Sequence, residues 1–262
     1  MPSVRPFSPL PSTALALTLL VATSATVTTA PALAHPPSDG GLTTVALFNP
    51  AALETPEGLV FDRAGNVYVS LALTGEIRKI SPQGVATTHA FLPIGPPLTP
   101  CNGFIGIMGA LAIDSQDRIY AAVAACDPAN RGIWRVAPNG TASLIANLPT
   151  DALPNGIALE RGNVYVSDSS APRIWTARAE VGSTARIWLE DSLLSAPPLP
   201  NTPAGNGLQI FRNELYVAIS GAGTIVVVPF ERRDEPGIPR VHATLPAGVG
   251  CDDFAFDVHG SI

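Results

Sequence analysis

Two stretches of the sequence contain the same hexapeptide, GNVYVS, and their surroundings decide the fold. The first stretch reads EGLVFDRAGNVYVS (57–70) and the second reads NGIALERGNVYVS (155–167). In both, apolar side chains alternate with other residues before a turn and again after it, as Leu59 and Phe61 do in the first stretch. This period of two predicts a pair of antiparallel strands rather than a helix. The glycine and asparagine between the strands are residues that accept the positive φ of a hairpin turn.

Three further segments repeat the pattern along the chain. They are Gly109–Asp114 followed by DRIYAA, Asn206–Phe211 followed by NELYVA, and Asp252–Asp257 followed by HGSI. Successive repeats begin 52, 46, 51 and 46 residues apart, which leaves room for about four short strands in each. Glycine and proline make up 50 of the 262 residues, a composition that suits many short strands joined by turns. The sequence therefore predicts an all-β fold, a β-propeller in which each repeat forms one blade.

The two ends of the repeat region carry further expectations. Residues Thr43–Asn49 are predicted to form one more strand, of the kind that completes the last blade of a closed propeller. The fifth repeat reaches Ile262 in the middle of its second expected strand. The pattern indicates a propeller fragment, truncated at its C-terminus, with about four and a half blades present. The alternative is a natural five-bladed or open form.

The N-terminal segment has the features of a signal peptide, predicted over residues 1–34. Arg5 supplies a positive charge, residues 14–27 are apolar and uncharged, and Ala32-Leu33-Ala34 is a cleavage motif. A membrane anchor is the competing interpretation, but the apolar run is interrupted by Ser and Thr and has no stop-transfer charges after it. We therefore expect cleavage after Ala34, a linker over residues 35–42, a propeller domain over residues 43–262, and a secreted or periplasmic protein.

Charge and cysteine content exclude some functions and leave others open. The net charge is −6, and the lysines and arginines do not cluster, so binding to nucleic acid is not expected. No later segment is long enough to span a bilayer, so no membrane partner is expected either. In an exported protein Cys101 and Cys126 can pair in a disulfide, although all three cysteines could equally be small buried residues.

One position of the repeat gathers oxygen-bearing side chains. The residue at the start of each repeat is, in chain order, Glu57, Gly109, Asn155, Asn206 and Asp252, called the register residues below. Because the inner strands of a propeller line its central channel, these residues should face one cavity. The alternative is that Asn and Asp merely suit the turn that enters a strand. Two carboxylates and two amides without histidine predict a site for Ca²⁺, or less tightly for Mg²⁺ or Mn²⁺.

The ordered Glu-Gly, Asn-Gly, Asn-Gly and Asp pattern resembles the SMP-30/gluconolactonase/luciferin-regenerating-enzyme-like family, over about residues 43–262. The resemblance implies a six-bladed propeller with a divalent metal in its channel. It also implies that Glu57, Asn155, Asn206 and Asp252 are the metal ligands, and that Asp252 acts in addition as catalytic base or nucleophile. Two departures are Gly109, where some members carry a polar substrate contact, and Asp253, where a glycine usually follows the ligand.

Two functions of different classes remain after this reading. The leading hypothesis is a secreted, metal-dependent hydrolase that acts as a monomer on a small lactone or related ester. The alternative is a non-catalytic binding propeller of the NHL type, since one propeller fold serves many functions. The four register residues with oxygen-bearing side chains favour the hydrolase, because a binding propeller has no need of them.

Overall fold

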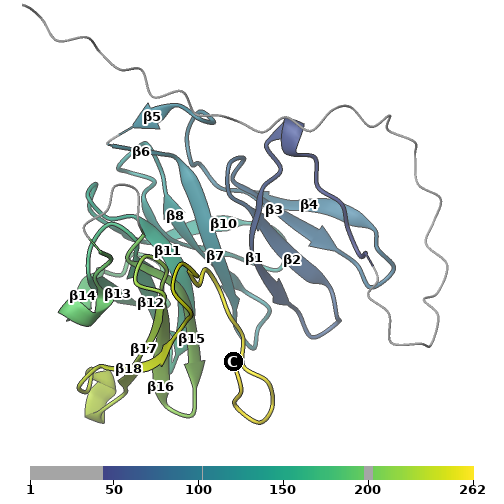
Figure 1. Ribbon diagram of the computed structural model, residues 1–262. Helices are drawn as coiled ribbons and strands as arrows, with labels where there is room; N and C mark the ends of the chain where they lie inside the picture. The colour runs from purple at the N-terminus through teal and green to yellow at the C-terminus, as the bar shows by residue number, and fades with distance from the viewer. Residues whose placement is uncertain (1–43, 102, 198–202) are drawn as a thin grey trace, which may run out of the picture. The chain divides into compact units, whose positions relative to one another are not determined.

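The computed structural model describes residues 44–101, 103–197 and 203–262, and its main elements are four antiparallel sheets of four strands (Figure 1). The predicted signal peptide, residues 1–34, and the linker, residues 35–42, lie outside the described residues. No helix in the described part of the chain is long and apolar enough to cross a membrane.

Each sheet is one blade and follows the chain from its inner to its outer strand. The first blade comprises β1 (Pro56–Phe61), β2 (Val67–Leu71), β3 (Glu76–Ile80) and β4 (Ala86–Phe91). The second comprises β7 (Ile107–Ile113), β8 (Ile119–Ala124), β9 (Gly132–Val136) and β10 (Ala142–Asn147). The third comprises β11 (Pro154–Glu160), β12 (Asn163–Asp168), β13 (Arg173–Arg178) and β14 (Arg186–Glu190). The fourth comprises β15 (Gly205–Phe211), β16 (Glu214–Ile219), β17 (Thr224–Pro229) and β18 (Arg240–Thr244). Four repeats are thus four complete blades, which confirms the all-β, blade-forming prediction.

The blades pack face to face through apolar side chains, and their inner strands are neighbours in the order β1, β7, β11, β15. One core lies between the first and second blades around Ile77 and Met108, and a second lies between the second and third around Ile133 and Val166. A third lies between the third and fourth blades. Each second strand is buried along its length, apart from its first residue in the first, third and fourth blades, as expected for a strand covered on both faces.

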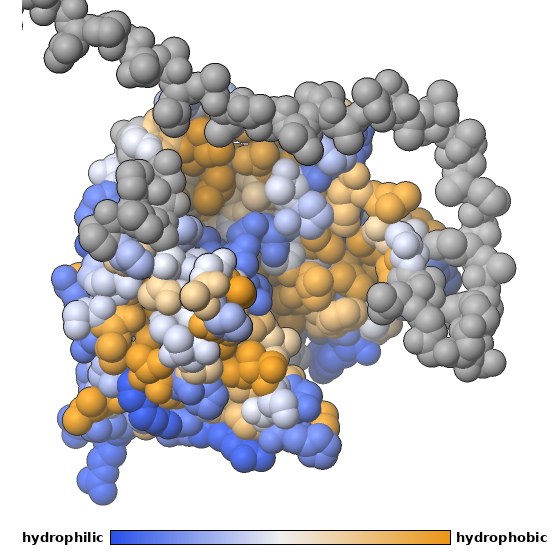
Figure 2. Space-filling view, viewed as in Figure 1, coloured by the Kyte–Doolittle hydropathy of each residue, from blue (hydrophilic) through white to orange (hydrophobic). Residues whose placement is uncertain are grey.

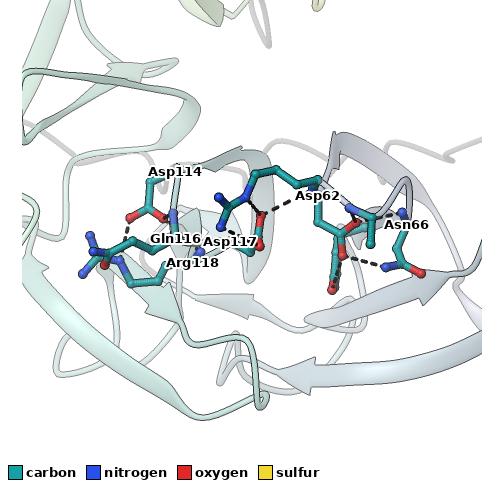
Figure 3. Close-up of polar contacts among 9 residues, drawn as sticks. Asp62, Asn66, Asp114, Gln116, Asp117 and Arg118 are labelled. Carbon is teal, nitrogen blue, oxygen red and sulfur yellow. Dashed lines mark hydrogen bonds and ion pairs between the residues drawn. The ribbon is translucent and has the colours of Figure 1, made fainter.

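The turns after the inner strands are of two kinds, and the residue at their start decides which forms. Asp62 and Asp114 each begin a five-residue loop and accept two backbone N–H groups on Oδ1, from residues two and four positions later, at 2.8–3.0 Å. Figure 3 shows both loops, which Arg63 and Asp117 join at 3.3 Å. The third and fourth blades have Glu and Phe at this position, and there the strands are joined by two-residue turns with positive φ at both residues.

The fifth repeat differs from the prediction. Residues 251–262 contain no strand, although Asp257 accepts N–H bonds from His259 and Ser261 at 2.8 Å, in the same way as Asp62 and Asp114. Phe256 stacks on Phe211 of the fourth blade with ring centroids 4.8 Å apart. The turn forms because its hydrogen bonds are local, and the packing forms because Phe256 faces the fourth blade. A strand would need a second strand to pair with, and residues 251–262 do not contain one.

The segment before the first blade also differs. Residues 44–49 are not a strand in the structure, because none of them pairs with another strand. Ala46 and Phe48 nevertheless pack against Val69 and Leu71, on the face of the first blade that is turned away from the second. The inner strand of this blade leaves Leu59 59% and Phe61 60% exposed, and apolar side chains gather in this part of the surface in Figure 2.

A small hairpin interrupts the connection between the first and second blades. It consists of β5 (Pro100–Cys101) and β6 (Phe104–Ile105). The structure joins Cys101 to Cys126, at the end of the second strand of the next blade, with Cα atoms 5.3 Å apart. Cys251 is a free thiol, and the pairing is the one that the sequence analysis considered.

Candidate functional site

A cavity of about 100 Å³ lies where the inner strands begin, and the register residues converge on it. Its lining consists of Glu57, Ala110, Asn155, Asn206, Gly207, Asp252 and Asp253. The four residues that the sequence analysis selected for their oxygen atoms therefore face one cavity, although they are up to 195 positions apart in the chain. The second blade contributes Ala110 rather than an oxygen-bearing side chain, because its register residue is Gly109.

A β-bulge in each inner strand explains why these side chains leave the sheet. Pairing with the second strand shifts between Pro56 and Leu59, and the same shift recurs in β7, β11 and β15, around Gly109, Asn155 and Asn206. A bulge turns a side chain away from the regular alternation and is frequent beside functional sites. The repeated bulge thus directs each register residue into the space between the inner strands.

Serine hydroxyls satisfy the backbone groups that two of the bulges leave unpaired. Ser70 accepts a hydrogen bond from Gly58 N at 2.8 Å and lies 2.9 Å from the carbonyl oxygen of Gly109 in the next blade. Ser167 accepts from Gly156 N at 2.8 Å and donates to the carbonyl oxygen of Asn206. Both serines are the last residue of GNVYVS, so the repeated hexapeptide fixes the position of the following blade's register residue.

In the first, third and fourth blades, the close approach of the inner strands requires glycine after the register residue. In the second blade the register residue itself is glycine, and Ala110 follows it. A Cβ on Gly58 would lie 2.7 Å from Ala110 Cα and 2.8 Å from Leu111 N, distances that real Cβ atoms do not show. The Glu-Gly and Asn-Gly pairs of the sequence therefore combine a side chain for the cavity with the absence of one at the strand contact.

Asn206 is held so that its amide oxygen faces the cavity. Its Nδ2 donates to Ser220 Oγ at 2.9 Å, and Ser220 Oγ in turn donates to the carbonyl oxygen of Cys251 at 2.6 Å. Because Nδ2 is engaged and Asn206 is buried, with 7% of its surface exposed, the side chain is held in one orientation. Its amide oxygen, Oδ1, is therefore available to a ligand. The same chain of bonds fixes the backbone just before Asp252, in the way that outer-shell contacts orient metal ligands.

Backbone contacts also distinguish Asp252 from Asp253. Gly207 N donates to the carbonyl oxygen of Asp252 at 2.9 Å, which corresponds to the contacts that the carbonyl oxygens of Gly109 and Asn206 receive from the preceding blade. Asp252 is accordingly the fifth register residue, in the position that the spacing to Asp257 predicted. Asp253 also lines the cavity, and its Oδ1 accepts from Phe254 N at 2.9 Å.

Electrostatically the cavity is negative and has no cationic side chain in its lining. Burial and the nearby charges of Asp252 and Asp253 raise the pKa of Glu57 from 4.5 to about 7. Burial, and to a lesser degree Asp252, also raises the pKa of Asp253, against the hydrogen bonds that Phe254 and Gln209 donate to it. Such an excess of carboxylates without a counter-charge is what a bound cation would relieve.

The donor set fits a hard divalent cation only when the amides are included. Among the described residues, no three His, Cys, Asp or Glu side chains are placed so that they could hold a metal ion by themselves. Adding Asn155 and Asn206 to Glu57 and Asp252 gives the mixture of carboxylate and amide oxygens that is typical of Ca²⁺ sites. Asn155 and Asp252 form no side-chain hydrogen bond with another described residue, so their oxygens are available for a ligand.

Two features of the site were missed by sequence reasoning. Asp253 was regarded as an unusual replacement of glycine, yet it is a third carboxylate of the cavity. Ser220, which orients Asn206, has Ser169 at the matching position of the third blade but alanine in the first two, so only two blades carried its signal. The role of Ser70 and Ser167 was detectable, because both end the repeated hexapeptide.

No protein-family model matches the sequence, and no curated protein matches it either. Solved structures do resemble the fold. A regucalcin described as a calcium-binding protein, from Agrobacterium tumefaciens, is 18% identical with a TM-score of 0.57, over 79% of this chain and 66% of its own. A gluconolactonase from Xanthomonas campestris is 16% identical with a TM-score of 0.57, over 79% and 68%. A streptogramin B lyase is 16% identical with a TM-score of 0.57, over 84% and 64%. The resemblance that the repeats suggested is confirmed for the fold, and the chain spans about two thirds of the length of these proteins.

Proposed function

We propose that this protein is a divalent-cation-dependent hydrolase of lactones or related esters, with Ca²⁺ as the cation. The convergence of Glu57, Asn155, Asn206 and Asp252 on one negative cavity is the observation that carries the proposal. A propeller that only binds a protein or glycan has no need of such a set, which is why the hydrolase is favoured over an NHL-type binding propeller. The calcium-binding and gluconolactonase structures of the same fold support the choice of cation and substrate.

The proposed chemistry divides between the cation and the side chains. When bound, a divalent cation would polarise the carbonyl group of the substrate. Asp252, exposed and without a side-chain hydrogen bond to another described residue, would accept the proton of the attacking water. Asn155 and Asn206 would contribute neutral oxygens that hold the cation without adding negative charge. Glu57 would supply the second carboxylate, from the first blade.

Calcium titration followed by thermal denaturation tests the proposal. A calcium concentration 100 times the dissociation constant should stabilise the protein by about 2.7 kcal/mol, which raises Tm by roughly 5–10 °C. Glu57→Gln and Asp252→Asn should lose most of this stabilisation. Asp253→Asn, a change of the same kind one residue away, should keep at least half of it.

Hydrolysis is then measured on a sugar lactone, an aliphatic lactone and an aryl ester, with calcium and with a chelator. Asp252→Asn should lose turnover of whichever substrate the wild-type protein accepts. Stabilisation by calcium without turnover of any substrate would contradict the hydrolase and retain the cation site. Absence of both effects would contradict the whole proposal.

We also propose that the protein is exported and acts as a monomer. The Cys101–Cys126 disulfide supports export, because structural disulfides persist in oxidising compartments. Expression in a secreting host should yield a product that begins at His35 and elutes as a monomer. A cell-retained product with an intact N-terminus would contradict export.

A further inference from the structure

A second cavity, of about 270 Å³, lies at the opposite end of the third blade from the candidate metal site. Its lining includes Asn163, which pairs with the last residue of β11, whereas Asn155 lies next to the first residue of that strand. The outer strands β13 and β14 form one side, and the turn after β17 forms the other. The two cavities share no lining residue.

Three arginines line this cavity, and too few free carboxylates are present to neutralise their charge. The three arginines are Arg178, Arg186 and Arg233. Arg233 forms no hydrogen bond or ion pair with another described residue, and Arg178 donates only to the neutral Asn163 side chain, at 3.3 Å. Arg186 lies 3.7 Å from the exposed carboxylate of Glu235, a long and solvent-screened contact.

The one acidic side chain in the lining is already occupied. Asp234 Oδ1 lies 3.0 Å from Arg161 Nη1, and Asp234 Oδ2 accepts from Asn163 at 3.3 Å. Because the charge of Asp234 is paired with Arg161, which does not line the cavity, Asp234 does not neutralise the three arginines. The cavity therefore presents positive charge on a protein whose net charge is −6.

The walls of the cavity are fixed by packing. Trp188 Nε1 donates to the carbonyl oxygen of Asp234 at 2.6 Å, and Phe230, just before the turn, packs on Trp188 and Tyr165 with ring centroids 5.2 Å apart. Arg233 and Asp234 both adopt left-handed φ values, 64° and 60°, which non-glycine residues hold only when their surroundings impose them. The buried side chains of Tyr165 and Thr176 also line the cavity, and the Thr176 hydroxyl donates to the carbonyl oxygen of Val164 at 3.0 Å.

We propose that this cavity is a binding site for a small molecule that carries a phosphate or carboxylate group. Guanidinium groups recognise such oxyanions by paired, charge-assisted hydrogen bonds. Three of them around a preformed cavity are suited to one oxyanion, and the volume leaves space for the remainder of a small organic molecule. The inference is independent of the hydrolase proposal, because no residue of the metal cavity takes part.

Isothermal titration of the calcium-free protein with inorganic phosphate tests the site, and sodium acetate serves as the carboxylate arm. Sodium chloride keeps the ionic strength constant. Saturable binding of either anion, with a dissociation constant on the order of 1 mM, supports the proposal, and the tighter of the two identifies the group that is recognised. Failure of both anions to saturate at about twenty times that concentration overturns it.

Variants locate the binding. The double variant Arg178→Gln/Arg186→Gln should weaken binding by about tenfold or more. Arg233→Gly removes the third guanidinium in a residue type that accepts φ of 64°, so it remains informative even if the double variant does not fold. Arg233→Gly should weaken anion binding about threefold or more. Arg63→Gln removes the same charge from an exposed turn of the first blade and should leave binding unchanged. An equal loss in Arg63→Gln would show non-specific attraction and overturn the proposal.

Discussion

Replacement of Glu57 by glutamine should stabilise the calcium-free protein at alkaline pH. The pKa of Glu57 is raised from 4.5 to about 7, so folding disfavours its ionised form. At about 1.4 kcal/mol per pKa unit, the shift corresponds to at most about 3 kcal/mol. Because Glu57 is only half-buried and water screens part of this cost, we expect a gain of about 1–2 kcal/mol.

The sign of the pH dependence follows from the raised pKa. In the wild-type protein this contribution to stability is fully present below pH 4.5 and is lost as the pH rises through 7. The glutamine variant does not titrate, so the two proteins should be equally stable at pH 4, should diverge between about pH 4.5 and 7, and should keep a constant difference above pH 7. Thermal denaturation in a chelator at both pH values measures the difference, which should reach roughly 2–8 °C in Tm at pH 8.

Glu214→Gln is the matched control, since its effect should have the opposite sign. Burial tends to raise the pKa of Glu214, but hydrogen bonds from Arg240 and Tyr216 lower it overall. Its replacement should therefore destabilise the protein at pH 8. If Glu57→Gln were no more stable than wild type at pH 8 without calcium, the description of the cavity as an uncompensated negative cluster would be wrong.

Three further predictions concern the framework of the site. Gly58→Ala should destabilise the protein by about 1–3 kcal/mol, because a Cβ there would overlap the next inner strand; an unchanged urea midpoint would refute this close contact. The double variant Cys101→Ser/Cys126→Ser removes a crosslink between residues 25 positions apart. Thermal denaturation without reductant should show a free energy of unfolding that is lower by about 2–4 kcal/mol. Ser220→Ala should weaken calcium binding by about 10–100-fold in a titration, since the amide of Asn206 is no longer oriented; unaltered affinity would exclude that role.

Much of the site could be predicted because the repeat itself encodes it. The period-two pattern predicted about four and a half blades, of which the structure has four complete ones, and the spacing of the register residues predicted that Glu57, Asn155, Asn206 and Asp252 face one cavity. The geometry that performs this, a bulge with glycine after the register residue, is local to each of the inner strands β1, β11 and β15. A feature repeated in every blade is visible in a single sequence, because each copy confirms the others.

Features outside the repeat were not predictable in this way. A strand was expected at Thr43–Asn49, but its described part, residues 44–49, forms none, since strand pairing depends on a partner and not on the segment's own composition. Asp253 enters the cavity because residues 251–262 pack on the fourth blade without strand pairing, so two successive side chains can line one space. The second cavity depends on the turn at Arg232–Asp234, which has no counterpart in the other blades.

The central claim is that one cation binds between the inner strands. Crystals grown with Mn²⁺, which accepts the same hard oxygen ligands, allow the cation to be located by its anomalous scattering. The account predicts a single strong peak in the cavity, within about 2.0–2.6 Å of oxygens from Glu57, Asn155, Asn206 and Asp252. Absence of a peak there, or a peak bound only by other residues, would contradict it.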